Sequence, residues 1–406
     1  MTTLPENASL LSTPEVWMEG AALEQLARVA GFPGCRQAVG MPDLHPGPGI
    51  PIGAAFDFAG TIRPHLVGSD AGCGVLVVAV PKLKASGDAL HRRILATADD
   101  DPLDGVDRAA LVAAVWEKGP AALAEAAGVP ASLADLAERF SEDPAWLANI
   151  ESAPPEDLSL FASALGSIGG GNHFLELSRV SSVTDRDAAA AAGLRKGGYA
   201  VIAHSGSRGL GRALIDRWGM AVLRDEAEQG RYLAELAGAV RFARANRLVL
   251  CWTLLHAAGV AKASKIGGGF DVIHNTVVPW AAGGWLHRKG SAPAGAGEPT
   301  IVLGSRGAES WVMAGAGAKA CLCSVAHGAG RKMGRGEAVD KLKVRYRRSE
   351  LTRTSLGGRV ICANPSLLYA EHPDAYKAIG PVVDALEVAG AARRVAALSP
   401  MVTIKR

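Results

Sequence analysis

Five side chains that bind divalent metals well stand at or near glycine-rich turns of this 406-residue sequence. They are Asp70, Cys73, His173, His204 and His274. Asp70 and Cys73 lie three residues apart across a glycine turn, which can point a carboxylate and a thiolate at one centre. Oxygen, sulfur and nitrogen donors together suit a borderline divalent ion. Five donors exceed what one tetrahedral ion takes with a position left open, so a thiolate bridging two ions would use them all.

Each of these residues also has an ordinary structural explanation. A single histidine after an apolar run is more often a packed or turn residue than a ligand. A cysteine in a reducing compartment is commonly a small buried apolar residue. The five positions are scattered along the chain and match no compact zinc pattern. The spacing alone therefore leaves both interpretations open.

His327 stands in a different setting, the segment SVAHGAGRKMGR. An imidazole followed by Gly-Ala-Gly and three cations can attack a phosphorus atom while amides and cations hold the phosphate oxygens. That chemistry is covalent phosphoryl or nucleotidyl transfer, and the alternative is a turn histidine ahead of a solvated helix. Residues 331–353 hold nine Lys or Arg against three acids. This basic segment is either a surface for a phosphate backbone or a solvated face.

Short apolar strands are expected to position these turns. Val75–Val80, Tyr199–Ala203 and Thr300–Leu303 are β-branched runs that end in glycine or lie close to one, and each predicts a strand. Ala213–Ala245 alternates apolar and polar faces at helical spacing and predicts one helix. Residues 281–299 resemble a loop in composition.

Residues 85–165 differ in composition from the rest of the chain. They are rich in Ala, Leu, Asp and Glu at helical spacing and contain several prolines, which predicts a helical insertion. No repeat and no long linker divides the sequence. We therefore expect residues 1–406 to form one large α+β unit that includes the insertion.

Charge and cysteine usage limit the class of protein. The net charge is only +3, so any nucleic-acid surface must be local. Six widely spaced cysteines in a large chain without a secretory start indicate a reducing compartment, and we expect a cytoplasmic protein. The longest apolar stretch, residues 248–260, is shorter than the roughly 18 residues a membrane span needs, so no membrane partner is expected.

Eight motifs in fixed order resemble the RtcB family of RNA-splicing ligases. They are MPDLHPGPGIPIG, SDAGCG, GGNHFLE, HSGSRGLG, HNTV, HRKG, GS-x5-WVM and HGAGR. The resemblance runs from about residue 35 to the C-terminus, and only residues 85–165 lack a matching motif. It implies mixed and antiparallel β-sheets flanked by helices. It also implies an RNA ligase that depends on GTP and Mn2+.

The resemblance implies a role for each chemical residue. Asp70, Cys73 and His173 match the ligands of one Mn2+ ion, while Cys73, His204 and His274 match those of the other. Zn2+ or Co2+ would also suit these donors. His327 matches a guanylylated nucleophile, and Asp43 matches an acidic residue that activity needs near the metals. The positions expected to hold GTP are Asn172, Glu176, Ser305, Ser310, Ala329, Tyr369 and Lys405. Arg208 and Arg331 are the expected RNA contacts.

The implied reaction joins two RNA ends. A 2′,3′-cyclic phosphate is opened to a 3′-phosphate, and His327 takes GMP from GTP and passes it to that phosphate, giving RNA-(3′)pp(5′)G. A 5′-hydroxyl end then seals the strand and releases GMP. Arg212, Arg306 and Ala308 depart from the family pattern. They indicate a divergent paralogue that acts on tRNA or damaged ribosomal RNA, with a release-factor-like or other activating protein as a partner.

Two functions of other classes stay open. A dinuclear phosphoesterase acting on RNA cyclic phosphates would need the metal ligands but not His327, Glu176 or Lys405. A non-catalytic protein that binds RNA ends would need neither the ligands nor the nucleophile. Metal retention and labelling by GTP distinguish the three functions.

Overall fold

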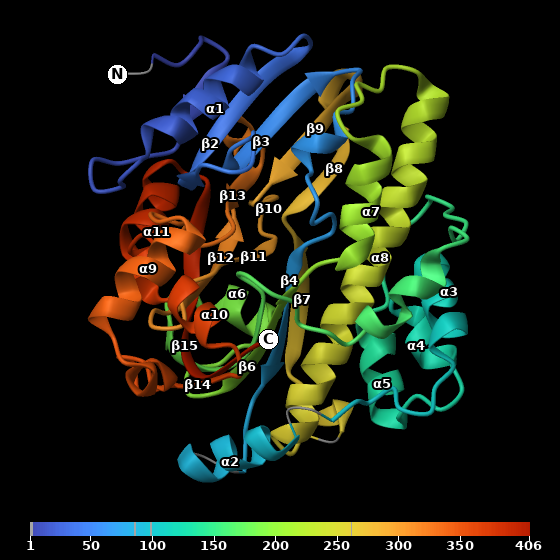
Figure 1. Cartoon of the computed structure of the whole chain (residues 1–406), viewed down its shortest axis with the longest axis vertical. Helices are drawn as coiled ribbons and strands as arrows, with labels where there is room; N and C mark the ends of the chain where they lie inside the picture. The colour runs from blue at the N-terminus through green and yellow to red at the C-terminus, as the bar shows by residue number, and fades with distance from the viewer. Residues whose placement is uncertain (1–2, 85–86, 98–99, 261) are drawn as a thin grey trace.

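The computed structural model describes residues 3–84, 87–97, 100–260 and 262–406 (Figure 1). Two β-sheets and a two-stranded ribbon make up its strand content in these ranges. The strands are β1 (Ala8–Leu10), β2 (Cys35–His45), β3 (Ile52–Ala59), β4 (Gly74–Val80), β5 (Phe174–Val183), β6 (Tyr199–Ser205), β7 (Gly268–Ile273), β8 (Asn275–Trp280), β9 (Gly284–Lys289), β10 (Ser291–Pro293), β11 (Pro299–Val302), β12 (Ser310–Gly315), β13 (Ser324–Ala326), β14 (Arg359–Cys362) and β15 (Ala392–Lys405).

The larger sheet has the order β11-β12-β15-β5-β6-β4-β7, and β14 pairs with β15 beside this path. The smaller sheet has the order β1-β2-β3-β9-β8, and β10 pairs with β13. The pairs β1–β2 and β14–β15 are parallel, and the other strand pairs are antiparallel. The predicted α+β class with mixed and antiparallel sheets is confirmed.

Helices flank the sheets (Figure 1). The α-helices are α1 (Gly20–Ala30), α2 (Gly87–Thr97), α3 (Arg108–Lys118), α4 (Ala121–Glu125), α5 (Ala131–Arg139), α6 (Arg186–Ala191), α7 (Gly209–Trp218), α8 (Glu226–Ala257), α9 (Arg335–Arg345), α10 (Pro365–Ala370) and α11 (Ile379–Val388). The 3-10 turns are η1 (Pro64–Leu66), η2 (Leu158–Ala164), η3 (Ala263–Lys265), η4 (Ala281–Gly283), η5 (Lys319–Cys321), η6 (Arg348–Thr352) and η7 (Pro373–Ala375). No helix in the described ranges is long and apolar enough to cross a membrane.

The apolar run of β4 is explained by burial on both of its faces. Val75 and Val77 pack into a core shared by the two sheets, whereas Leu76 and Val78 pack into a core under α8 and the helices of the 85–165 segment. Successive side chains of a strand point to opposite faces, so a strand covered on both sides must be apolar throughout. Burial on both faces therefore fixes the position of β4 in the sheet, and Cys73 directly precedes the first residue of this strand.

The three predicted strands are confirmed as β4, β6 and β11, but the single helix Ala213–Ala245 is wrong. The chain forms α7, breaks at Gly219, which has a φ of +47°, and starts again as α8. The side chain of Asp225 caps α8 by accepting hydrogen bonds from the amides of Ala227 and Glu228. Helical spacing continues across this break, and the cap decides the boundary.

The loop predicted for residues 281–299 is also wrong. β9 fills the space between β3 and β8 in the smaller sheet, and β10 pairs with β13. Glycine and proline give this segment the composition of a loop, but β8 and the more distant β3 and β13 pair with it and make it two strands. The helical prediction for residues 85–165 holds for α2 to α5 and η2, while residues 85–86 and 98–99 lie outside the described ranges.

Candidate active site

The predicted metal ligands come from four neighbouring strand ends. The start of β4 pairs with the ends of β6 and β7, and the start of β5 pairs with the end of β6. Cys73 directly precedes β4, His173 directly precedes β5, His274 directly follows β7, and His204 is next to last in β6. Because antiparallel neighbours alternate in direction, two strand starts and two strand ends lie side by side at the same end of these four strands. The four side chains therefore meet there.

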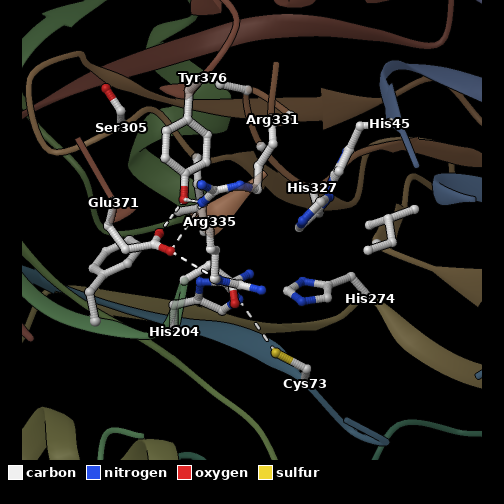
Figure 2. A pocket seen from close by; sticks show the side chains of 18 of the residues that line it. His45, Cys73, His204, His274, Ser305, His327, Arg331, Arg335, Glu371 and Tyr376 are labelled. Atoms are coloured by element: carbon white, nitrogen blue, oxygen red, sulfur yellow. Dashed lines mark hydrogen bonds and ion pairs between the residues drawn. The ribbon is translucent and has the colours of Figure 1, made fainter. Parts of the chain in front are cut away.

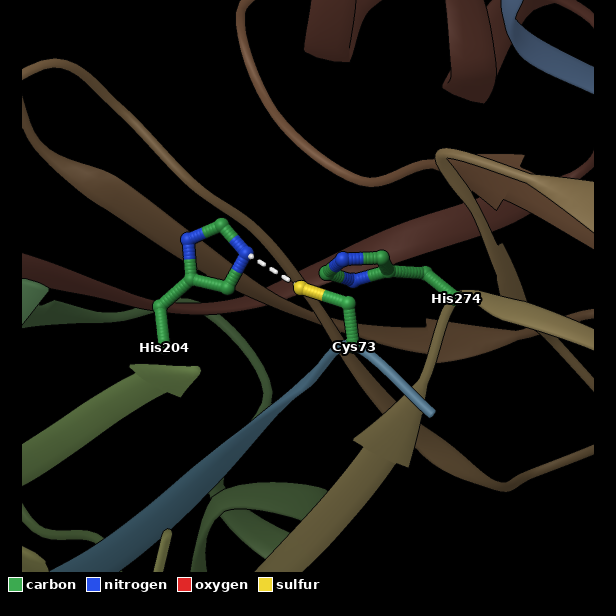
Figure 3. A group of neighbouring side chains, drawn as sticks. All are labelled: Cys73, His204 and His274. Atoms are coloured by element: carbon green, nitrogen blue, oxygen red, sulfur yellow. Dashed lines mark hydrogen bonds between the residues drawn. The ribbon is translucent and has the colours of Figure 1, made fainter. Parts of the chain in front are cut away.

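Two groups of these side chains could hold a metal ion. Cys73, His204 and His274 form one group, and Asp70, Cys73 and His173 form the other, with the donor atoms of each group within 4.8 Å of one another. The Sγ atom of Cys73 lies 3.4 Å from Nε2 of His204 and 3.3 Å from Nε2 of His173. Figure 3 shows the first group around the Cys73 sulfur. Cys73 belongs to both groups, as a bridging ligand would.

Burial sets the charge state of these donors. Burial, followed by the neighbouring His173, holds the pKa of His204 well below its usual value, and burial, followed by His327, does the same for His274. Burial and then Asp70 raise the pKa of the Cys73 thiol well above its usual value. Neutral imidazoles are the form that binds metals, whereas a buried thiolate needs a cation to compensate it. The donor set therefore fits a bound divalent cation.

Asp70 completes the second group from the glycine turn before β4. Its Oδ2 atom lies 2.9 Å from Nε2 of His173. Burial opposes ionisation of Asp70, but His173 outweighs it and holds the pKa of the carboxyl well below its usual range. A Cβ atom at Gly206 would lie 2.1 Å from Oδ1 of Asp70, so the glycine in the HSGSRG motif leaves room for this carboxylate.

His327 lies directly beside the metal groups. It follows β13, and its ring centroid is 4.9 Å from that of His274. Its Nδ1 atom lies 2.6 Å from Oδ2 of Asp43, although the two groups do not have the angles of a hydrogen bond. The contact is an electrostatic one between a buried carboxylate and the imidazole ring. Nδ1 of His327 therefore faces Asp43, and Nε2 is the ring nitrogen on the opposite side.

A cavity of about 530 Å³ unites these residues. This volume is in the range of small-molecule and cofactor sites. The predicted residues that line it are Asp70, Cys73, Asn172, Glu176, His204, His274, Ser305, His327, Ala329, Arg331 and Lys405. Figure 2 shows His274 and His327 on one side of this cavity and Glu371 and Tyr376 on the other. We call it the catalytic cavity below.

Glu176 and Lys405 are buried, oppositely charged residues in the wall of the catalytic cavity. Glu176 accepts hydrogen bonds from the hydroxyls of Ser178 (2.8 Å) and Thr403 (2.6 Å). Burial raises the pKa of Glu176 to about 7. Lys405 donates to the carbonyl of His173 at 3.0 Å, and burial lowers its pKa to about 8. Both side chains can form further hydrogen bonds with a ligand in the cavity.

Some predicted site residues lie behind the cavity wall. The hydroxyl of Ser310 accepts a hydrogen bond from the amide of Gly304 at 3.0 Å, so it supports the loop that carries Ser305. The hydroxyl of Tyr369 donates to the carbonyl of Tyr346 at 3.2 Å, and this ring is buried among the residues around α9 and α10. Both residues support the site from outside in this arrangement.

The two predicted RNA contacts are engaged within the protein. Arg208 has a φ of +60°, and its Nε atom donates to the hydroxyl of Ser167 at 3.1 Å. Arg331 donates to Oε1 of Glu371 at 3.1 Å and stacks its guanidinium over the ring of Tyr376. Their role toward RNA stays a prediction.

The cavity also contains polar residues that the sequence did not identify as functional. His45, Asn275 and Lys289 line it from within the motifs MPDLHPGPGIPIG, HNTV and HRKG, so those motifs could have revealed them. Glu371 and Tyr376 belong to no motif. Glu371 is buried and accepts hydrogen bonds from Arg331, Arg335 and Tyr376, and this network becomes visible only when the fold brings α9 and α10 together.

Comparison with known proteins gives the family. A family model described as tRNA-splicing ligase RtcB matches residues 25–227 and 214–406. The chain is 36% identical to the RNA-splicing ligase RtcB2 of Escherichia coli over 97% of this chain and 94% of that protein. It is 32% identical to the RNA-splicing ligase RtcB of Mycobacterium tuberculosis, over 94% of this chain and 100% of that protein. It is 31% identical to the tRNA-splicing ligase RtcB of Thermococcus kodakarensis, over 95% of this chain and 91% of that protein. This chain belongs to the RtcB family.

Proposed function

We propose that this protein is an RNA ligase that uses GTP and Mn2+ to join RNA 3′-phosphate or 2′,3′-cyclic phosphate ends to 5′-hydroxyl ends. The observation that carries the proposal is the position of His327. It stands beside two metal-binding groups, with Asp43 at its Nδ1 atom, in a cavity that also exposes Glu176 and Lys405. A simple phosphate-releasing site has no use for that combination.

His327 acts as the nucleophile in this proposal. Its Nε2 atom attacks the α-phosphorus of GTP, forming an N–P bond as pyrophosphate leaves. Asp43, 2.6 Å from Nδ1, orients the ring and stabilises the positive charge that develops on it. GMP then passes from His327 to the RNA 3′-phosphate, and a 5′-hydroxyl displaces GMP to seal the strand.

The metal donors have a separate task. Asp70, Cys73 and His173 would hold one divalent ion, and Cys73, His204 and His274 the other, with Mn2+, Zn2+ or Co2+ compatible with these atoms. Such ions neutralise phosphate charge and increase the reactivity of oxygen nucleophiles when they are bound.

The guanine end of GTP is assigned to Glu176 and Lys405. A buried carboxylate can accept from the ring NH and the exocyclic amine of guanine, a pattern that adenine lacks. Asn172, Ser305 and Ala329 line the remaining cavity, and Ser310 and Tyr369 support its wall.

The RNA partner follows from the relatives. Several of them are named tRNA-splicing or RNA-splicing ligases, which supports an RNA substrate such as tRNA. Damaged ribosomal RNA and the 3′-phosphate, cyclic phosphate and 5′-hydroxyl ends belong to the proposal itself. Arg208 and Arg331 remain the proposed phosphate contacts, and a release-factor-like or activating protein the proposed partner. The six cysteines are free of disulfides, which fits a reducing compartment such as the cytoplasm.

The test uses GTP labelled at the α-phosphate. The Mn2+-loaded protein should acquire acid-labile label, and His327→Ala should reduce the label to background because the attacking nitrogen is gone. His65→Ala is the matched control, since His65 is equally buried but lies outside the cavity. Chelation of the metal should also abolish labelling.

Absence of label on the folded, metal-loaded parent protein would overturn the ligase proposal and favour a dinuclear phosphoesterase. Labelling that persists in His327→Ala would move the nucleophile to another residue.

A further inference from the structure

A second cavity of about 660 Å³ lies on another part of the molecule. Its lining comes from α2, the second half of β5, the turn before β6, the segment up to the start of β14, and the middle of β15. The pairing of β15 with β5 has a register shift between Pro400 and Val402 in this part of the sheet. In Figure 1 these elements lie in the lower part of the molecule, away from the smaller sheet. This second cavity has no role in the function proposed above.

The lining of the second cavity is strongly cationic. It contains Arg179, Lys196, Arg353 and Arg359, together with His91, against one carboxylate, Asp88. Arg359 lies 2.5 Å from Asp88 and neutralises it. Arg179 and Lys196 are exposed, and neither forms an ion pair with any residue in the described ranges. The cavity therefore has an excess of positive charge that the protein itself does not compensate.

Apolar side chains form another part of the same cavity. Leu90, Val180 and Pro400 form its buried base, while Met401 is half-buried and Leu356 is 45% exposed, so these two side chains offer apolar surface. Cations beside apolar surface match a sugar-phosphate unit, whose phosphate is charged and whose ribose and base have apolar faces. A bare inorganic anion would have no use for the apolar part.

A strand connects the second cavity to the catalytic cavity. Val402 of β15 lines the second cavity, and Lys405, three residues further along, lines the catalytic cavity. At about 3.3 Å per residue the two positions are roughly 10 Å apart. The two side chains point to opposite faces of β15, so an RNA strand that reaches both cavities would have to pass around the edge of the sheet.

The basic segment 331–353 joins the two cavities by a second route. Arg331 and Arg335 line the catalytic cavity, and Arg353 lines the second one. Between them, α9 exposes Lys341 and Lys343 along its surface. Consecutive cations at this spacing can follow a phosphate backbone.

We propose that the second cavity binds a phosphodiester unit of the single-stranded RNA whose 3′ end occupies the catalytic cavity. The inference rests on the proposed ligase function and adds a binding site remote from the reacting phosphate. Phosphate is the shared chemistry of RNA and of free anions, and the basic segment 331–353, which contributes arginines to both cavities, favours RNA.

The experiment compares two variants with the same change in net charge. Arg179→Glu/Lys196→Glu reverses the charge of the second cavity, and Arg186→Glu/Arg231→Glu reverses two exposed cations outside both cavities. Binding is measured for a 3′-phosphorylated RNA of about ten nucleotides, for a 3′-phosphorylated dinucleotide and for inorganic phosphate, at several salt concentrations. Labelling by GTP reports on the catalytic cavity independently.

We expect the second-cavity variant to bind the longer RNA on the order of tenfold more weakly near 0.1 M salt. The slope of the logarithm of the binding constant against the logarithm of the salt concentration should become less steep by about 1.4, because two phosphate contacts are lost. Binding of the dinucleotide and labelling by GTP should match the control variant. Equal binding of the longer RNA by both variants, in protein that still takes label from GTP, would overturn this inference alone.

Two other outcomes are also informative. A loss confined to inorganic phosphate, with RNA binding unchanged, would identify a free-anion site and overturn the RNA assignment. A parent protein that neither takes label nor binds RNA would overturn the proposed function and this inference with it.

Discussion

Glu176 is a buried carboxyl group in the cavity wall that accepts hydrogen bonds from two hydroxyls. Its hydrogen bonds from Ser178 and Thr403 stabilise the charged form, as does the charge of Lys405, but burial outweighs them and raises the pKa to about 7. A ligand that donates to this carboxylate would supply the missing compensation. The residue therefore links nucleotide binding to pH and to stability.

We expect Glu176 to make the protein less stable as pH rises from about 4.5 to about 7. The folded state holds a proton on this group that the unfolded state has released in that window, so the free energy of unfolding falls by up to about 3 kcal/mol across it. Glu176→Gln should remove this part of the pH dependence. Chemical denaturation of parent and variant at several pH values measures it.

The same variant should take up less label from GTP above pH 7, because guanine loses a charged acceptor. An unchanged pH slope of stability in Glu176→Gln would contradict the assignment of a raised pKa to this carboxyl.

At the scale of elements, α8 does more than cover the sheet. Three of its arginines, Arg241, Arg244 and Arg247, follow one another at i, i+3 and i+6 and are buried. Arg247 is fully buried, binds Asp271 through two nitrogens, and donates to the carbonyls of Gly72 and Ser205 at 2.9 Å each. Those carbonyls directly precede Cys73 and follow His204 in the chain. Arg247 therefore acts as a positioning residue for the metal groups.

We expect Arg247→Met to weaken metal retention by 10- to 100-fold, the range typical for loss of groups that orient metal ligands. It should also destabilise the fold by roughly 3–5 kcal/mol, because a buried carboxylate loses most of its pairing. Dialysis against graded chelator followed by mass-spectrometric metal analysis measures retention in folded protein.

Arg241→Met is the matched control on the same helix. Arg241 binds Asp143 and the carbonyls of Leu147 and Ile150, which belong to the segment before η2 and not to the metal site. It should lose a similar amount of stability and keep its metal. Equal metal loss in both variants would show that general destabilisation, and not positioning, causes the effect.

At the scale of the whole molecule, the helices of residues 85–165 dock on α8 through a close contact. Trp116 of α3 lies so near Gly238 of α8 that a Cβ atom there would be 1.9 Å from the indole ring. The indole Nε1 atom also donates to the carbonyl of Ala153 at 3.1 Å, which limits how far the ring can move. Glycine at 238 is therefore a condition for the docking of α3.

We expect Gly238→Ala to lower the free energy of unfolding by about 1–3 kcal/mol, because overpacking outweighs the gain in helix propensity. Gly230→Ala, in the same helix but with no atom within 4 Å of the added Cβ, should instead gain up to about 1 kcal/mol. Thermal and denaturant unfolding measure both. A neutral or stabilising Gly238→Ala would mean that α3 shifts freely on α8.

The sequence by itself determined which side chains are candidates for the chemistry. Local residue types, glycine turns and apolar runs marked Asp70, Cys73, three histidines and His327 as candidates and predicted the strands next to them, while the family resemblance implied their roles as metal ligands and nucleophile. The α+β class followed from the same patterns and is confirmed by the sheets. The roles of the individual site residues stay predictions until they are measured.

The tertiary structure decided what depends on distant partners. β9 and β10 are strands because β3, β8 and β13 pair with them, and the break between α7 and α8 depends on a cap that helical spacing does not reveal. The network around Glu371, the support of Cys73 and His204 by Arg247, and the second cavity all join segments far apart in the chain. Local patterns record which face of an element is buried, but the free energy of pairing and close packing is fixed only when the partner element is in place.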